Sequence, residues 1–140
     1  MKNLGLKEGA KRDIGNKGNQ VPDASFFSSN FSDDKGWWMS PNGIIEQYVK
    51  VILTKSDVHN RSNTHQERMK NISFPIVFPV AFLGASVTNL DTPWIYIETS
   101  WVSDVSKTSI TVWAGIYLPV NRNDVLPESD VTIYLRVWGK

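Results

Sequence analysis

Cysteine, long hydrophobic runs and a strong net charge are all missing from this sequence of 140 residues. Without cysteine there can be no disulfide framework, thiolate metal site or cysteine nucleophile. The formal net charge is +1, and lysines and arginines are interspersed with nearly as many acids, so no basic stripe is available for nucleic acid. No hydrophobic run is long enough to span a bilayer, and the N-terminus lacks the apolar segment of a secretory signal. We therefore expect neither nucleic-acid binding nor membrane insertion.

Catalytic motifs are missing as well. The sequence has no nucleotide-binding glycine loop and no Gly-x-Ser-x-Gly elbow. The acids that could cleave a glycoside, residues 33–34 and the pair Glu128 and Asp130, stand in polar stretches typical of turns and loops. His59 and His65 match no zinc-ligand spacing. A weak metal site or a site on a symmetry axis remains open for them, but a solvated loop is favoured. We expect no enzymatic activity, no cofactor and no metal.

Residues 1–35 differ in composition from the rest of the chain. They are polar and rich in glycine, asparagine, lysine and aspartate, with few aliphatic side chains. Such a segment cannot bury enough apolar surface to offset the entropy lost when it becomes ordered. It is either a disordered tail or a strip that folds only against other copies of the chain. We place a domain boundary between residues 35 and 36.

From residue 36 onwards the sequence pattern indicates β-structure. Asn42-Gly43 predicts a tight turn, and it precedes a run with alternating hydrophobic side chains. The predicted strands are residues 44–54, 72–79, 80–90, 94–102, 109–118 and 131–138. The prolines at positions 75 and 79 place the second strand at an edge or a bend, with Phe74 and Phe78 as buried anchors. We expect an all-β domain, an antiparallel sandwich or barrel.

Two polar stretches interrupt this pattern. Residues 55–70 have no useful periodicity, and residues 119–130 contain a proline near each end. Polar connections of this length in a compact domain are usually functional or mobile. If successive strands alternate in direction, both stretches lie at the end of the domain away from residues 1–35. Loops carried by a rigid sheet commonly provide recognition, so we expect the binding site at that end.

Short motifs in both parts of the chain resemble tail-fibre proteins of tailed phages. Residues 4–6 read Leu-Gly-Leu, residues 10–15 read Ala-Lys-Arg-Asp-Ile-Gly and residues 21–23 read Val-Pro-Asp, similar to the fibre shaft of those proteins. Residues 41–47 read Pro-Asn-Gly-Ile-Ile-Glu-Gln and residues 74–79 read Phe-Pro-Ile-Val-Phe-Pro, similar to their C-terminal domain. The motifs occur in the order that the family has.

The chain departs from the family pattern in two places. Tyr48-Val49 stands where the family usually has Trp-Gly, and residues 55–70 form a longer stretch than expected. The resemblance implies a homotrimer in which three shaft segments, residues 1–35, wind together. Three antiparallel β-sandwich tip domains, residues 36–140, would then pack at the distal end of the tail fibre. It also implies a location in a virion or phage-tail-like particle.

The resemblance further implies a receptor-binding tip that attaches the particle to a bacterial surface carbohydrate such as lipopolysaccharide, with a fibre-assembly chaperone as another partner. Sugar rings stack on tryptophan or tyrosine, while amide, carboxylate and guanidinium groups bond their hydroxyls. The predicted ligand-binding residues are His59, Asn60, Arg61, His65, Trp94, Asn121, Arg122, Asn123 and Asp124. The alternative function is a structural module that trimerises or caps the fibre and binds no ligand.

Overall fold

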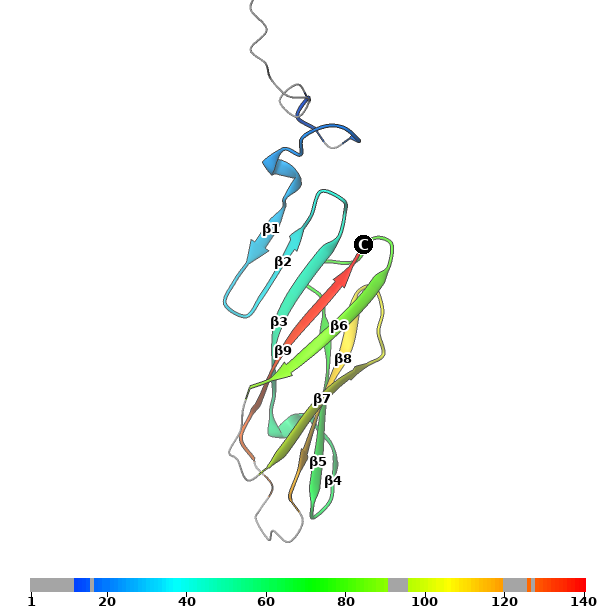
Figure 1. Ribbon diagram of the computed structural model, residues 1–140. Coiled ribbons are helices and arrows are strands. Elements are labelled where there is room, and N and C mark those ends of the chain that lie inside the picture. Colours follow the sequence, from blue (N-terminus) through cyan, green and yellow to red (C-terminus); the bar gives the residue numbers. More distant parts are fainter. Residues whose placement is uncertain (1–11, 16, 91–95, 120–125, 127) are drawn as a thin grey trace, which may run out of the picture.

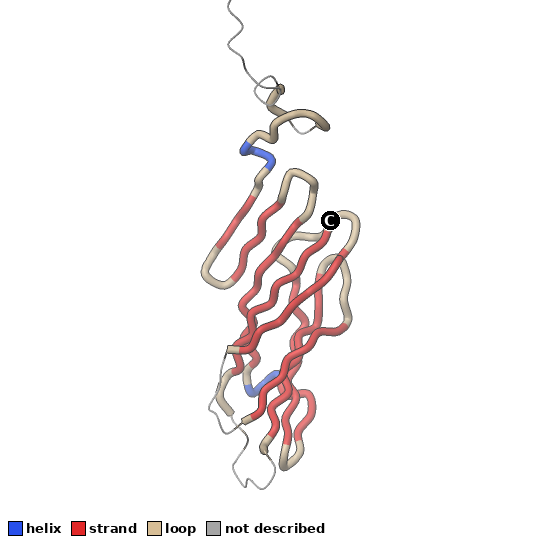
Figure 2. The backbone as a smooth tube through the Cα atoms, in the orientation of Figure 1, coloured by secondary structure: helices blue, strands red, loops and turns tan. Residues whose placement is uncertain are grey.

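The computed structural model describes residues 12–15, 17–90, 96–119, 126 and 128–140, which form two antiparallel β-sheets (Figure 1, Figure 2). The five-stranded sheet has the order β1 (Ser29–Phe31), β2 (Lys35–Met39), β3 (Ile45–Leu53), β9 (Val131–Gly139) and β6 (Phe82–Asn89). The four-stranded sheet has the order β4 (Val58–Arg61), β5 (His65–Ser73), β8 (Ser109–Tyr117) and β7 (Ile97–Ser103). Two short 3-10 turns, η2 (Ala24–Phe26) and η3 (Lys55–Asp57), are the helical elements of the described residues.

Alternating side chains of the long strands fill the space between the sheets. β9 turns one set of side chains inward, all at most 2% exposed, while Tyr134 on its other face is 47% exposed. Burial of each such aliphatic side chain contributes about 1.5–3 kcal/mol. The core strands supply Ile45, Val51, Leu53, Ile110, Val112, Ala114, Ile116, Val131, Ile133, Leu135 and Val137. The predicted all-β antiparallel sandwich is confirmed.

Neighbouring strands in each sheet are antiparallel and run along the long axis of the domain, and β4 continues in the direction of β3 after η3 (Figure 1). The described residues before β1 and the end of β9 therefore lie at one end, and the turn between β4 and β5 lies at the other. The backbone N–H of Leu118 donates to the carbonyl of Thr64, 2.9 Å away. Leu118, which directly precedes the second polar stretch, thus lies beside the β4–β5 turn.

The tight turn predicted at Asn42-Gly43 is confirmed. Gly43 has a φ of +83°, in the left-handed region that glycine adopts without strain. Its backbone N–H donates to the carbonyl of Ser40 at 2.9 Å, and the Asn42 side chain accepts from the Ile44 N–H at 3.2 Å. This turn joins β2 to β3 and sets the register in which Met39 stands opposite Ile45.

The prediction that residues 55–70 form an irregular polar connection was wrong. Most of them form η3, β4 and the first part of β5. The pattern was hidden because polar side chains occupy the inward positions: Gln66 is 1% exposed and Arg68 is 0% exposed. Hydrophobic alternation cannot identify a strand whose buried face carries an amide and a guanidinium group.

The prediction of a strand over residues 72–79 was also wrong. β5 ends at Ser73, and residues 74–79 form no strand, since prolines at positions 75 and 79 cannot donate to a ladder. The expected bend and the anchors are confirmed, with Phe74 8% and Phe78 0% exposed. The side chain of Gln47 takes the place of the missing ladder hydrogen bonds. Its Nε2 donates to the Ile76 carbonyl at 2.8 Å, and its Oε1 accepts from the Ile76 N–H at 2.9 Å.

The five-stranded sheet begins before residue 36, because β1 pairs with β2 over three residues. The predicted domain boundary after residue 35 stays a prediction. Further towards the N-terminus, Ile14 and Val21 form a parallel bridge, closed by hydrogen bonds from the Gly15 N–H to Val21 and from the Val21 N–H to Asp13. The Ile14 side chain is 70% exposed, so this part of the chain leaves apolar surface in contact with solvent.

Candidate binding surface

Two tryptophans stack on the outer face of the four-stranded sheet. Trp101 of β7 and Trp113 of β8 are cross-strand partners, and their ring centroids are 5.7 Å apart with planes inclined by 9°. His59 of β4 meets Trp113 edge-on, at 5.2 Å and 88°. The Trp113 indole N–H donates to Ser103 Oγ at 2.9 Å, which fixes the ring orientation. Both tryptophans remain partly exposed, so part of this stack contacts solvent.

A second aromatic pair lies nearer the β4–β5 turn on the same face. His65 of β5 and Tyr117 of β8 are cross-strand partners, with ring centroids 5.9 Å apart and planes inclined by 17°. His65 Nδ1 is 2.6 Å from Ser62 Oγ in the turn, and this hydrogen bond orients the imidazole. The pair is therefore held from both sides, by stacking and by the turn.

Gly115 joins the two pairs. It lies on β8 between Trp113 and Tyr117 and is buried although it faces outward. A Cβ at this position would lie 2.8 Å from the Tyr117 ring and 3.1 Å from Trp101, so both rings lean over the glycine. The result is one continuous area, called here the aromatic surface, made of His59, His65, Trp101, Trp113 and Tyr117.

Polar groups flank the aromatic surface. Glu67 on β5 and Thr99 on β7 stand opposite Gly115 on either side, and their residues alternate onto the outer face. Asn71 Nδ2 donates to Thr111 Oγ1 at 3.2 Å further along the same face. Ring faces combined with carboxylate, hydroxyl and amide groups can stack a sugar ring and bond its hydroxyls.

The structure brings together only part of the predicted site. His59 and His65 belong to the aromatic surface, and Asn60 and Arg61 are exposed at the end of β4 beside it. The remaining predicted residues lie outside the described residues: Trp94, Asn121, Arg122, Asn123 and Asp124. Sequence reasoning missed Trp101 and Trp113. One feature of the sequence could have identified Trp101, because this residue lies in a predicted strand at a position that alternates onto the outer face.

A buried arginine supports the end of the domain that carries this surface. The Arg68 guanidinium donates through Nη1 to the carbonyls of Leu53 and Ser129, at 2.9 and 2.7 Å, and through Nε to Gln66 Oε1 at 2.8 Å. Removal from water lowers the pKa of Arg68, and the charge of Asp130 opposes that effect. The side chain thus connects β3, β5 and the segment before β9.

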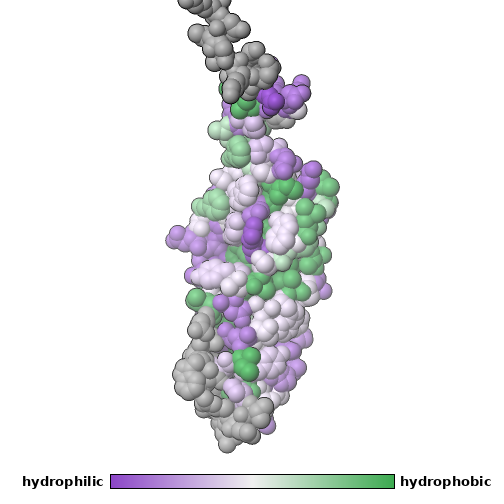
Figure 3. Space-filling view, in the orientation of Figure 1, coloured by the Kyte–Doolittle hydropathy of each residue, from purple (hydrophilic) through white to green (hydrophobic). Residues whose placement is uncertain are grey.

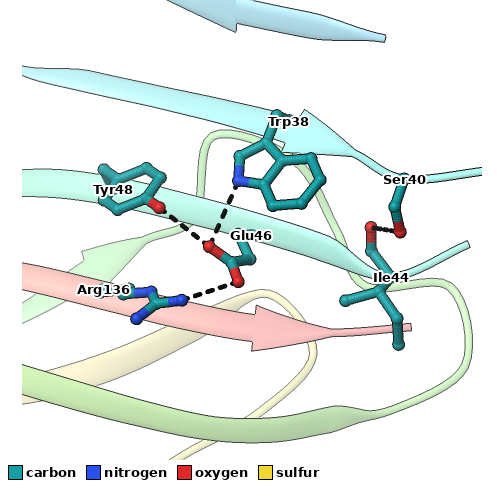
Figure 4. A network of polar contacts seen from close by, with 6 residues as sticks. All are labelled: Trp38, Ser40, Ile44, Glu46, Tyr48 and Arg136. Carbon is teal, nitrogen blue, oxygen red and sulfur yellow. Dashed lines mark hydrogen bonds and ion pairs between the residues drawn. The ribbon is translucent and has the colours of Figure 1, made fainter. Parts of the chain in front are cut away.

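The outer face of the five-stranded sheet carries a different set of aromatic residues. Figure 3 shows polar and hydrophobic residues interleaved on the face in view, and Figure 4 shows a network on this sheet around Glu46. The Glu46 carboxylate accepts from Arg136 Nη2 at 2.8 Å, Tyr48 Oη at 2.9 Å and Trp38 Nε1 at 3.2 Å. The hydrogen bond from Arg136, opposed by partial burial, lowers the pKa of Glu46, and the same contact raises the pKa of Arg136. The carboxylate thus accepts three hydrogen bonds, which link β2, β3 and β9 on this face.

Among the described residues, no group of three or more histidine, aspartate or glutamate side chains could hold a metal ion. The same residues include no helix that is long and apolar enough to cross a membrane.

Comparison with known proteins gives one family and two solved structures. The family model described as "Putative tail fiber protein gp53-like, C-terminal" matches residues 38–125, more than half of the chain. The R1 pyocin fibre of P. aeruginosa, comprising its C-terminal residues 323–701, has a similar fold: TM-score 0.57 and 19% identity over 81% of this chain. An N-truncated R1-type pyocin tail fibre has TM-score 0.55 and 19% identity, over 81% of this chain and 86% of its own. The chain spans only 28% of the longer pyocin fibre. No curated protein matches the sequence.

Proposed function

The chain belongs to the family of gp53-like tail-fibre C-terminal domains, and on that basis we propose that it is a receptor-binding tip that attaches a phage or pyocin-like particle to a surface carbohydrate of a bacterium. Membership of this family places it in the tail fibre of such a particle. Lipopolysaccharide is the proposed receptor, since it is the carbohydrate that covers a Gram-negative cell. The tip binds the sugar without cleaving it.

The aromatic surface is the observation that carries this proposal. It lies on the outer face of the four-stranded sheet, and the part formed by His65 and Tyr117 reaches the end opposite the N-terminal residues (Figure 1). A domain whose N-terminal side continues into a fibre shaft presents that opposite end to the cell. The distal position of the surface in the assembled fibre is part of the proposal.

Binding would use stacking and hydrogen bonds together. Sugar C–H faces pack on the exposed ring areas of Trp101 and Trp113, and hydroxyls bond to the flanking Glu67 and Thr99. Arg61, exposed at the end of β4, provides a charged donor for phosphate or carboxylate groups of a surface glycan. Because the rings are already packed against one another, little side-chain entropy is lost on binding.

A glycan array tests the proposal. The full chain is expected to bind bacterial surface glycans, and a Trp101→Ala, Trp113→Ala double variant is expected to lose that binding while remaining folded by circular dichroism. Trp38→Ala, on the outer face of the other sheet, is the matched control and should bind normally. Arg61→Ala combined with Arg122→Ala should also abolish binding without a shift in Tm. Full binding by both folded double variants would overturn the proposal.

We propose that the chain is a homotrimer. The support comes from the N-terminal part, where Ile14, Val21 and Phe27 are 70%, 43% and 55% exposed and therefore suited to contact with other copies. A fibre-assembly chaperone is a further proposed partner during assembly. Sedimentation equilibrium should give about three times the chain mass of 15.8 kDa. A monomer at micromolar concentration would contradict this part of the proposal.

A further inference from the structure

A hollow lies on the five-stranded sheet where the β1–β2 turn arches away from it. The turn is tied to the sheet by a hydrogen bond from the Lys50 N–H to the Asp34 carbonyl, 2.7 Å long. The space has a volume of about 130 Å³ and is open to solvent. The hollow is lined by residues of the turn and of β1, β2, β3 and β9, and it is separate from the aromatic surface on the other sheet.

Three aromatic rings form the walls of this hollow. Phe31, Tyr48 and Tyr134 line it, and they are 60%, 38% and 47% exposed. Phe31 lies against Tyr48, with centroids 6.5 Å apart, and its ring covers the backbone of Gly36, which has no Cβ to push it away. Tyr48 is held in turn by its hydrogen bond to Glu46. The Phe31 and Tyr48 side of the hollow is therefore held by contacts within the sheet.

The rim of the hollow is polar and its charges balance. Asp33, Asp34, Lys35 and Lys50 all line it, two acids and two bases. Lys50 Nζ is 3.6 Å from Asp34 Oδ1, and the side chains are 36% and 72% exposed, respectively. An ion pair at this distance leaves hydrogen-bonding capacity on both partners. Such a rim favours a neutral ligand with hydroxyl groups over an anion or a cation.

We propose that this hollow binds one neutral pyranose ring, a hexose or deoxyhexose. A pyranose has C–H faces that can pack on the aromatic rings of the hollow, and hydroxyls that can both donate to Asp34 and accept from Lys50. The hollow has the mostly apolar walls and the few convergent polar groups of a ligand pocket, but its volume of about 130 Å³ is smaller than that of a typical pocket. The hollow has room for one ring, so it recognises a single residue of a glycan. This inference does not depend on the aromatic surface.

Ligand-observed saturation-transfer NMR tests the inference, with the full chain and the methyl pyranosides of glucose, galactose, mannose and rhamnose at millimolar concentration. Transfer to the ring C–H protons of at least one sugar is expected. Tyr134→Ala should weaken binding of that sugar about tenfold or more, because one stacking wall is lost. Tyr134→Phe keeps the ring and should keep the binding. Thr88→Ala, the cross-strand neighbour of Tyr134 on β6, is the matched control and should bind as the unmodified chain does.

The outcomes separate this site from the proposed receptor surface. In the Trp101→Ala, Trp113→Ala double variant, the transfer that depends on Tyr134 is expected to persist. Transfer that is unaffected by Tyr134→Ala, or absent for all four sugars, would overturn the inference. A change in sedimented mass caused by Tyr134→Ala would also overturn it, because the hollow would then be a contact between copies of the chain.

Discussion

Substitution of Arg68 by alanine is expected to destabilise the domain by about 3–5 kcal/mol. The side chain is fully buried, and its loss removes the donors that serve the carbonyls of Leu53 and Ser129 and the amide oxygen of Gln66. Each buried acceptor left without a partner costs about 1–3 kcal/mol. Partial relaxation and entry of water reduce the sum of three such losses, while the cavity adds to it.

Urea unfolding at a fixed protein concentration measures this effect, since stability depends on concentration if the chain assembles. Arg68→Met keeps most of the volume without the donors, and it should lose nearly as much stability as Arg68→Ala. Arg136→Ala is the matched control: this exposed arginine bonds the carboxylate of Glu46, and water replaces it on removal, so a smaller loss is expected. A loss below about 1 kcal/mol for Arg68→Ala, or full rescue by methionine, would refute the reasoning.

Three further predictions concern the rest of the structure. Gln47→Leu leaves the N–H and carbonyl of Ile76 without their partner and should cost about 2–4 kcal/mol in urea unfolding; an unchanged midpoint would contradict this. Phe78→Ala removes a fully buried ring and should cost about 3–5 kcal/mol, whereas a loss under about 1 kcal/mol would mean that the ring is exposed. The lowered pKa of Glu46 stabilises the fold above the unfolded pKa of about 4.5, and this contribution is lost as the pH falls through the folded pKa. The unmodified chain should therefore be more stable than Glu46→Gln at pH 7 and lose that advantage below pH 4.5; an advantage independent of pH would contradict the assignment.

The strands that could be predicted from the sequence are those whose buried positions are aliphatic. β9 and β8 alternate hydrophobic and outward side chains over nine residues each, so their pattern is visible without the rest of the molecule. β5 was missed because Gln66 and Arg68 fill its inward positions. The burial of those groups is possible only because distant backbone carbonyls accept from Arg68. A local sequence pattern cannot predict the burial of polar side chains when that burial depends on partners far away in the chain.

The candidate site, too, could be predicted only in part from the sequence. The family motifs in the chain identified a tail-fibre domain, and the assumed directions of the strands placed His59 and His65 at the end away from the N-terminal residues, where β4 and the start of β5 lie. The pairing of Trp101 with Trp113 depends on the register between β7 and β8, which no single strand specifies. Gly115, which lets two aromatic pairs meet, carries no chemical signal of its own in the sequence.

The alternating strands also decide how this domain bears mechanical load. If the chain tethers a particle to a cell as proposed, the pull acts between the N-terminal side of the domain and its far end. Because the strands run along that line, β1 is pulled parallel to β2 and its ladder is loaded in shear, with all three residue pairs sharing the force. The flanking hydrogen bonds, from the Met39 N–H to Ser28 and from the Ser32 N–H to Lys35, share it as well. A sheet with its strands across the line of pull would open one pair at a time, so this topology suits a tether.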